Sequence, residues 1–249
     1  MERWTGKTAV VTGASSGIGA AVCVALADAG LKVVGLARRQ ERVDLHIQLP
    51  ELSGKGSIVS RKCDVSNIKD IAGTFQWIDD DLGGIDLLVN NAGITYLSGQ
   101  EDVVATLDTN VKGIVLCTQL AVASMKRQKF EGHIINVNSI AGHYIPFSSE
   151  FNIYGSSKHA VTAFSAALAN ELADYHSGIK VTVRNSNLFN LWTSNYALIA
   201  FVQTPKHITL WRIRIVPASD KSSFKPVAWT PTEGLYSVKE SSAGGVMAE

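Results

Sequence analysis

Short apolar runs alternate along most of this chain with longer segments whose apolar residues recur at helical spacing. The runs predict strands at residues 7–12, 31–37, 57–63, 85–90 and 133–138 and the start of a strand at 180–183, with 7–12 and 85–90 expected to be buried. The longer segments predict helices over residues 20–29, 68–82, 101–126 and 152–175. Because strands that alternate with helices form parallel sheets covered on both faces, we expect a single α/β domain built on a doubly wound parallel sheet.

A glycine-rich turn follows the first predicted strand without a break. It reads Gly13-Ala-Ser-Ser-Gly17-Ile-Gly19, and the first predicted helix comes directly after it. A strand, a glycine turn and a helix in this order present backbone N–H groups and a helix N-terminus to a pyrophosphate. A plain tight loop is the alternative, but the second strand that follows the helix favours a nucleotide site. The candidate residues are Gly13, Ser15, Ser16, Gly17, Ile18 and Gly19.

Tyr154 and Lys158 form a second candidate site, on the last predicted helix. Residues at i and i+4 are neighbours on a helix, about 5–6 Å apart at Cβ. The lysine ammonium can therefore favour the phenolate and lower the tyrosine pKa from its usual value of about 10, which makes the tyrosine a proton-transfer residue. Such a pair alone is most often a solvated helix face, so it gains its meaning from the nucleotide signature upstream.

The chain resembles the short-chain dehydrogenase/reductase family through five motifs in the family's order. They are Thr12-Gly-Ala-Ser-Ser-Gly-Ile-Gly19, Asn90-Asn-Ala-Gly93, Asn110, Ser139 and Tyr154-x-x-x-Lys158. The resemblance covers roughly residues 5–183 and implies a Rossmann fold with oxidoreductase activity. Within the family, three segments look most like insect farnesol dehydrogenases and their vertebrate relatives: Met1-Glu-Arg-Trp-x-Gly-Lys7, Gly35-Leu-Ala-Arg-Arg39 and Cys63-Asp-Val65.

The resemblance implies a role for each of four residues. Ser139, at the end of the fifth predicted strand, would hold the substrate oxygen, and Tyr154 would exchange a proton with that oxygen. Lys158 would contact the nicotinamide ribose, and Asn110 would hold a water that links the lysine to solvent. The implied reaction is hydride transfer between the nicotinamide and an apolar alcohol or its aldehyde or ketone. Farnesol and farnesal are the first candidate pair, and a steroid or general carbonyl reductase is the alternative.

The charge after the second predicted strand favours NADP over NAD. Proteins that bind NAD usually place a carboxylate there for the ribose 2′-OH, and it would repel a 2′-phosphate. Here Arg38 and Arg39 follow the strand and suit a phosphate bidentately, with a solvated basic turn as the alternative. By resemblance, Asp64, which precedes Val65, would accept from the adenine amino group, although a strand-end cap is the other interpretation. Small residues that would allow the cofactor a close approach follow the fourth strand: Asn91, Ala92 and Gly93.

Composition and charge narrow the class of protein. The net charge is +1 and the isoelectric point about 7.7, so nothing favours nucleic acid or an anionic membrane as a partner. Cys23, Cys63 and Cys117 are far apart and are expected to be reduced core residues, and the histidines show no metal-ligand spacing. No apolar run reaches the ~18 residues of a membrane helix and the N-terminus is polar, so we expect a cytoplasmic protein. By family habit, the helices at about 102–126 and 152–175 would form a homodimer interface.

The resemblance ends after Val183, which divides the chain into two predicted parts. Residues 1–183 would form the nucleotide-binding domain, and 184–249 an atypical, partly disordered C-terminal segment. The family's Pro-Gly pair is missing, no last strand is recognisable, and residues 225–249 have the Pro, Ser and Gly content of a mobile tail. A divergent substrate cap, or an alternative or mis-spliced C-terminus, would explain the break, and its abruptness favours the second. The chain is therefore either a working dehydrogenase or a catalytically impaired nucleotide-binding or dimer-forming isoform.

Overall fold

The computed structural model describes residues 2–48, 56–95, 102–144, 152–175, 177–186 and 209–210. The strands are β1 (Thr8–Thr12), β2 (Lys32–Ala37), β3 (Ser57–Lys62), β4 (Leu87–Asn90), β5 (His133–Ser139), β6 (Lys180–Ser186) and β7 (Thr209–Leu210). The helices are α1 (Gly17–Asp28), α2 (Gln40–Gln48), α3 (Ile68–Leu82), α4 (Val103–Leu107), the π-helical segment η2 (Asp108–Lys112), α5 (Gly113–Gln128) and α6 (Asn152–Asp174). Two short 3-10 turns are η1 (Glu2–Trp4) and η3 (Ile140–Gly142).

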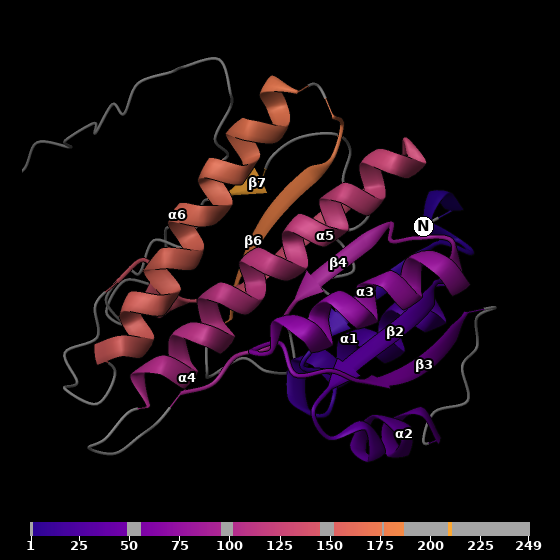
Figure 1. Cartoon of the computed structure of the whole chain (residues 1–249), viewed down its shortest axis with the longest axis horizontal. Helices are drawn as coiled ribbons and strands as arrows, with labels where there is room; N and C mark the ends of the chain where they lie inside the picture. The colour runs from indigo at the N-terminus through magenta and orange to yellow at the C-terminus, as the bar shows by residue number, and fades with distance from the viewer. Residues whose placement is uncertain are drawn as a thin grey trace, which may run out of the picture.

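The strands form one parallel sheet in the order β3-β2-β1-β4-β5-β6-β7 (Figure 1). This confirms the predicted α/β class and its doubly wound sheet. The order reverses between β1, which ends at Thr12, and β4, which ends at Asn90. Open α/β sheets bind ligands beyond the carboxyl ends of their strands at such a switch point, so the topology itself marks the position of a site.

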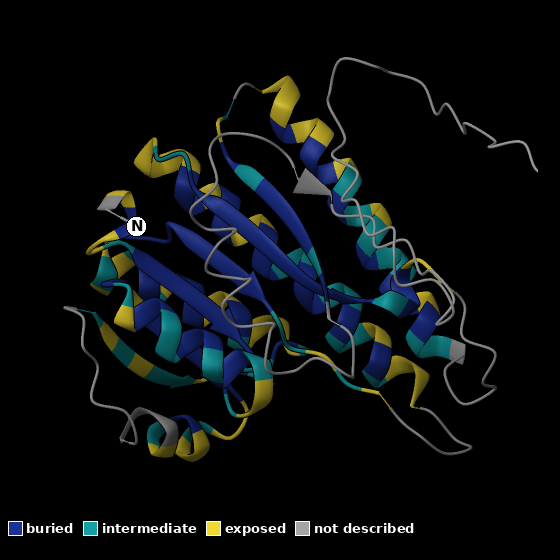
Figure 2. Cartoon of the chain, turned by 180° about the vertical axis from the view of Figure 1, so that it is seen from behind, coloured by how far each residue is buried: buried dark blue, intermediate teal, exposed yellow. Residues whose placement is uncertain are grey.

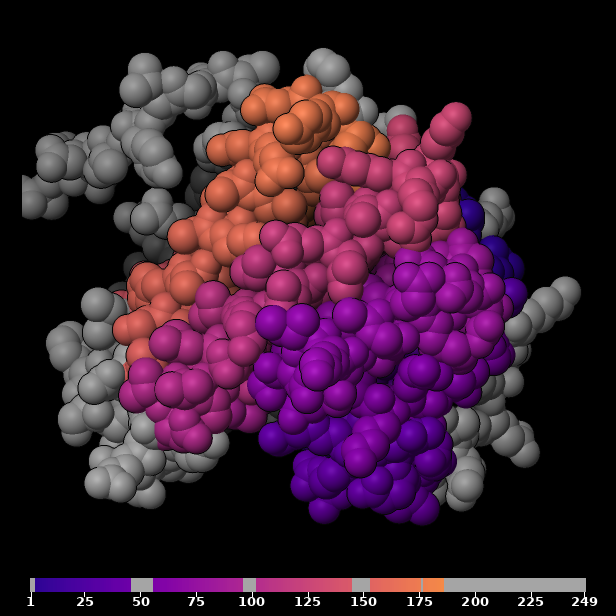
Figure 3. Space-filling view, viewed as in Figure 1, coloured from indigo at the N-terminus to yellow at the C-terminus, as the bar shows by residue number. Residues whose placement is uncertain are grey.

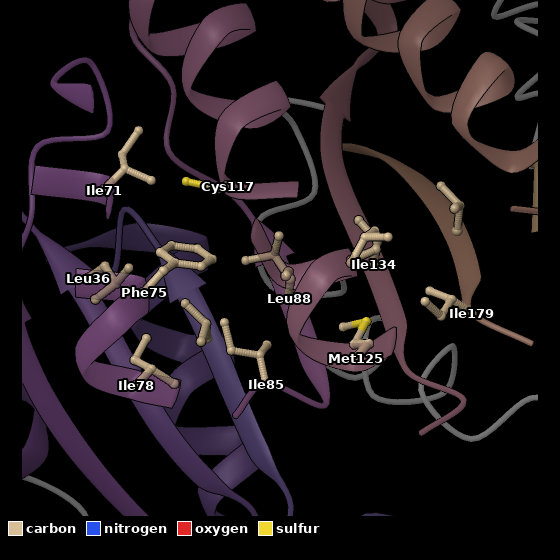
Figure 4. Packing of buried hydrophobic residues seen from close by; sticks show 14 of the residues in the cluster. Leu36, Ile71, Phe75, Ile78, Ile85, Leu88, Cys117, Met125, Ile134 and Ile179 are labelled. Carbon is tan, nitrogen blue, oxygen red and sulfur yellow. The ribbon is translucent and has the colours of Figure 1, made fainter. Parts of the chain in front are cut away.

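Helices cover both faces of the sheet, and each face has its own apolar core. Helices α3, α5 and α6 contribute to one core and lie side by side over it (Figure 3). Figure 4 shows Phe75 and Ile78 of α3 and Met125 of α5 beside Leu88 and Ile134 of the sheet. The second core lies under α1 and α2. Because the central strands β1, β2, β4 and β5 are buried between these layers (Figure 2), they are apolar runs in the sequence instead of alternating patterns. The edge strand β3 alternates between exposed and intermediate residues over most of its length.

The helix-spaced apolar residues of α6 and the three cysteines are core residues, as expected. Val161, Leu168 and Leu172 of α6 are buried, and Leu168 and Leu172 belong to the first core, with Phe164 partly buried against it. All three cysteines are buried free thiols, and burial raises the pKa of Cys63 to about 11. Among the described residues, no helix is both long enough and apolar enough to cross a bilayer.

Four features differ from the sequence-based expectation. Helix α2 was not expected, because its sequence is polar and, of the side chains described in it, only Val43 is buried. The single helix expected over 101–126 is divided by η2, whose wider turn contains Asn110. Strand β6 runs three residues beyond Val183 to Ser186, where it pairs with Ser139. No last strand is recognisable in the sequence, whereas the structure has β7, which pairs with β6 in parallel. The tail expected over 225–249 lies outside the described residues.

Candidate active site

The ends of β1 and β4 are joined at the switch point by a set of short polar contacts. The Thr12 hydroxyl accepts the backbone N–H groups of Asn91 and Ala92, each at 3.0 Å. The Asn91 side chain donates in return to the carbonyl oxygens of Thr12 at 3.0 Å and Gly13 at 3.2 Å. These bonds fix the glycine turn against the segment that follows β4.

The glycines of this turn are required by its geometry. Gly13 has a φ of +69° and Gly17 a φ of +56°, a region that side chains rarely adopt. A Cβ on Gly13 would lie 2.8 Å from Cα of Ala92, and a Cβ on Gly19 would overlap the Gly13 carbonyl oxygen. Gly13 therefore permits the turn and its close approach to β4, and Gly19 permits α1 to pack on the turn.

A cavity of about 430 Å³ opens at the switch point. Eleven of the predicted cofactor-binding residues line it: Gly13, Ser15, Ser16, Ile18, Arg38, Arg39, Asp64, Val65, Asn91, Ala92 and Gly93. Gly17, Gly19, Tyr154 and Lys158 are not among the lining residues. Five residues that were not predicted line it as well: Leu36, Ala37, Cys63, Ile94 and Thr109. Three of these five, Ala37, Cys63 and Ile94, directly adjoin a predicted cofactor residue. Thr109 precedes Asn110 and Leu36 lies two residues before Arg38, so proximity to the motifs was the signal available.

The basic end of the cavity is made by Arg38 and Arg39, directly after β2. Both side chains are exposed and line the cavity. Among the residues that the structure describes, neither guanidinium has an ion-pair partner. Helix α2 begins next to them and is held to β3, because the Gln40 amide donates to the Ser60 hydroxyl at 3.0 Å and Ser60 donates to Asp44. Two unpaired positive groups on a fixed turn are a suitable site for a phosphate.

Asp64 has a structural contact as well as a place in the cavity. Its carboxylate accepts the backbone N–H of Ser66 at 2.9 Å and the Ser66 hydroxyl at 2.7 Å. These bonds form the turn after β3, as the strand-end interpretation expects. Because Asp64 also lines the cavity, the structure is compatible with both roles.

Asn110 is fully buried in η2 and uses its whole side-chain amide. It donates to the Ile94 carbonyl and accepts the Ile94 N–H, both at 2.8 Å. It also donates to the Ser157 hydroxyl at 3.1 Å, and Ser157 donates to the Tyr154 carbonyl at 2.7 Å. An asparagine is a poor helix former unless its side chain bonds something, and π-helical turns are frequent at functional sites. Asn110 thus joins the segment after β4 to the helix of Tyr154.

Lys158 is buried on α6, with its ammonium 5.8 Å from the centre of the Tyr154 ring. The ammonium donates to the Val137 carbonyl at 3.3 Å. Burial lowers the pKa of Lys158 from 10.5 to about 8. A Cβ on Gly93 would lie 3.4 Å from Oδ1 of Asn110 and 3.7 Å from Nζ of Lys158, so both side chains meet beside the rim of the cavity.

Ser139 ends β5 at the same edge of the sheet. Its side chain caps η3 by accepting the N–H of Ala141 at 3.2 Å. A hydroxyl that accepts this bond keeps its own proton available for another acceptor. The η3 turn rests on α6, since a Cβ on Gly155 would lie 3.9 Å from the Ala141 carbonyl oxygen. The structure therefore places Ser139 next to the start of the helix that carries Tyr154.

A family model described as short chain dehydrogenase matches residues 7–190 of this sequence. The chain belongs to the short-chain dehydrogenase family. The match to this family includes the residues up to 190, slightly beyond the predicted limit at 183 and the end of β6. Nearly the whole described sheet, with the cavity and the four catalytic candidates, lies within it.

Individual relatives of this short-chain dehydrogenase support the narrower resemblance. It is 52% identical over 189 residues to a farnesol dehydrogenase of Aedes aegypti, covering 73% of this chain and 77% of that protein. It is 41% identical to dehydrogenase/reductase SDR family member 11 of Gallus gallus, covering 73% and 74%. A metagenomic short-chain oxidoreductase solved in complex with NADP superposes with a TM-score of 0.75 at 27% identity, covering 83% of this chain and 96% of that one.

Proposed function

We propose that this short-chain dehydrogenase is an NADP-dependent enzyme that interconverts an apolar alcohol and its aldehyde or ketone. The observation that carries the proposal is the meeting of Asn110 and Lys158 at Gly93, beside the rim of the switch-point cavity. Tyr154 precedes Lys158 by one turn on the same helix, which supports its role as the acid/base. The similarity to a farnesol dehydrogenase makes farnesol and farnesal the first substrate pair to test.

The residues of this chain would handle the proton and the substrate oxygen. Ser139, whose oxygen already accepts an N–H, would donate its proton to the substrate oxygen and hold it. Tyr154 would take the hydroxyl proton of the alcohol during oxidation and return it during reduction. Lys158 would favour the phenolate while it is charged and orient the ribose of the cofactor.

The cavity fits a dinucleotide, which would supply hydride acceptance and donation when bound. Gly13, Ser15 and Ser16 lie where a pyrophosphate meets backbone N–H groups at the start of α1. A Cβ on Gly13 would clash with Ala92, so the glycine supports the close packing of this turn against the segment after β4 that also lines the cavity. The unpaired Arg38 and Arg39 support a 2′-phosphate and hence NADP(H).

The experiment is oxidation of farnesol by the purified full chain with NADP, followed by the absorbance of the reduced cofactor. A short alcohol and a steroid alcohol are compared as substrates, and NAD is compared as cofactor. Tyr154→Phe removes the acid/base, whereas Tyr175→Phe changes an exposed tyrosine at the end of α6 as a control. Turnover that is lost in the first variant and kept in the second supports the proposal. Equal turnover in Tyr154→Phe contradicts it.

A catalytically impaired nucleotide-binding protein is the second candidate. The sequence after Val183 lacks the family's Pro-Gly pair, and this absence favours it. The described residues that line the cavity all lie between positions 13 and 109, which supports nucleotide binding by the part of the chain before the C-terminal segment. Tight binding of NADPH without turnover of any alcohol in the panel would favour this candidate.

Homodimer formation and a cytoplasmic location are further parts of the proposal. Val103, Val104 and Leu107 expose apolar surface on α4, and Leu120 does so on α5, within the helices expected to form the interface. Light scattering of the wild type and Val104→Glu tests this, because a charge in a dimer contact should shift the equilibrium to monomer. The three buried free thiols support a reducing compartment, which fractionation of cells tests.

A further inference from the structure

Thr162 lies one helical turn after Lys158 on α6, and its hydroxyl has three polar neighbours. It accepts the side-chain N–H of Asn138 at 2.9 Å. The Gly142 carbonyl oxygen lies 2.9 Å from the hydroxyl, and the Lys158 carbonyl oxygen 3.3 Å from it. Asn138 directly precedes Ser139, and Gly142 ends the η3 turn that Ser139 caps.

The single proton of the Thr162 hydroxyl goes to Gly142. A threonine has one O–H donor, and O–H···O bonds are typically about 2.5–3.0 Å long. The distance to Gly142 is 2.9 Å and within this range, whereas 3.3 Å to Lys158 is beyond it. The hydroxyl therefore joins α6 to η3 instead of bonding within its own helix.

Gly142 is packed tightly between the same partners. A Cβ on Gly142 would lie 2.6 Å from Nδ2 of Asn138 and 2.6 Å from the Lys158 carbonyl oxygen. The glycine lets η3 approach α6 closely enough for the Thr162 bond to form. Three elements thus meet here: the end of β5, the η3 turn and the first half of α6.

We infer that Asn138, Thr162 and Gly142 form a positioning clamp that fixes Ser139 relative to Tyr154 and Lys158. The inference rests on the proposed function, because that function assigns the reaction to Ser139, Tyr154 and Lys158. Thr162 is a positioning residue, because its hydroxyl is engaged by Asn138 and Gly142 and acts on the reacting groups only through Ser139 and α6. It acts by holding the turn that begins at Ser139 against the helix that carries Tyr154. Proton transfer requires the reacting groups to stay within hydrogen-bond distance, so this contact between turn and helix matters for the rate.

Two substitutions separate the hydroxyl from the shape of the side chain. Thr162→Val keeps the branched shape and removes the O–H, whereas Thr162→Ser keeps the O–H. We expect Thr162→Val to lower kcat about 10-fold or more through misplacement of the reacting groups. Thr162→Ser should keep kcat within about twofold of the wild-type value. The KM for NADP should change little in either variant, because neither substitution removes a proposed contact with the cofactor.

Thr118→Val is the matched control. The Thr118 hydroxyl on α5 accepts the side-chain N–H of Asn90, on β4, at 2.9 Å. This bond has the same length as the bond from Asn138 to Thr162, and it also joins a strand to a helix, but it joins β4 to α5 instead of β5 to α6. Its loss should lower the stability of the protein and leave kcat within about twofold. A loss of kcat in Thr118→Val as large as in Thr162→Val would show a general effect of stability and overturn the inference.

Hydrogen exchange provides a readout that does not depend on turnover. Amides of residues 139–144 and 154–158 should exchange faster in Thr162→Val than in the wild type, and Thr162→Ser should restore them. Unchanged exchange in Thr162→Val overturns the clamp, and faster exchange with an unchanged kcat overturns its positioning role. Failure of the proposed function has a different signature: the wild type shows no turnover, or Tyr154→Phe remains active. In that case the hydrogen-exchange comparison of Thr162→Val with the wild type still decides whether the clamp exists.

Discussion

Asn110 and Ile94 hold each other through two hydrogen bonds of 2.8 Å, in which one side-chain amide pairs with both backbone polar groups of a single residue. The same amide reaches Ser157 and, through it, the backbone of Tyr154. The segment beyond β4 and the helix that carries Tyr154 are therefore coupled by one buried side chain.

Replacing Asn110 by alanine should reduce both stability and activity. The substitution leaves the Ile94 groups and the Ser157 hydroxyl without their partner, which costs about 1–3 kcal/mol. We expect kcat to fall because the helix of Tyr154 loses its link to the cavity rim. Denaturant unfolding and steady-state kinetics measure the two effects. Asn67→Ala is the control. It removes the N-cap of α3, in which the Asn67 side-chain oxygen accepts the Lys69 N–H at 2.9 Å, and it should lower the stability by about 1 kcal/mol and leave kcat unchanged.

Lys158→Met should make the protein without cofactor more stable at neutral pH and inactive. Burial lowers the Lys158 pKa from 10.5 to about 8, so at and below pH 8 the folded protein holds a charge that the unfolded chain solvates better. Methionine removes this cost, which is at most about 3 kcal/mol.

The stability gained by Lys158→Met should depend on pH in one direction. The penalty in the wild type is complete below the folded pKa of about 8 and disappears as the pH rises to 10.5, where the unfolded chain also loses the proton. The difference between variant and wild type should therefore shrink between pH 8 and 10.5, as measured by urea unfolding at several pH values. A difference that does not depend on pH would contradict the buried charge.

Arg38→Asp combined with Arg39→Ala should shift the cofactor preference from NADP toward NAD. The change removes two phosphate-binding groups and adds a carboxylate that repels a 2′-phosphate. Dissociation constants for NADPH and NADH, measured by fluorescence, check the preference. Lys32→Asp reverses a charge at the opposite end of β2 and should leave the preference unchanged. If the double variant still prefers NADPH, these arginines do not bind the 2′-phosphate.

Gly19→Ala and Gly73→Ala should have opposite effects, although both glycines lie in helices. A Cβ on Gly19 would overlap the Gly13 carbonyl oxygen, so the turn must shift, which typically costs about 1–3 kcal/mol and weakens NADPH binding. Gly73 in α3 has no atom within 4 Å of an added Cβ, so alanine there should stabilise the helix by about 0.5–1 kcal/mol. Thermal unfolding with and without NADPH compares the two. A stabilised Gly19→Ala would show that the turn does not need its close packing.

The sequence predicted most of the fold because its strands are buried on both faces and its glycines interrupt the apolar pattern. The helix α3 occurs at the predicted residues 68–82, where Asn67 caps its start and Gly83 follows its end with a positive φ. Helix α2 was missed because its described side chains bury little apolar surface. The two residues of β7 are too few to show a period, so only pairing with β6 identifies them.

The candidate site was predictable to the extent that it consists of local motifs. The glycine turn, Arg38 and Asp64 lie on the cavity because each follows a strand at the same edge of the sheet. The contacts of Asn110 with Ile94, and of Thr162 with Gly142, were not predictable, because they join residues that only the tertiary packing brings together.

The order of the site along the chain has an evolutionary consequence. Every described residue that lines the cavity precedes position 110, and Ser139, Tyr154 and Lys158 follow it. A change in the sequence after β6 therefore leaves all of these residues in place. Selection can act on the two parts of the chain separately, so substitutions after β6 can accumulate in a lineage while the residues that line the cavity are inherited unchanged.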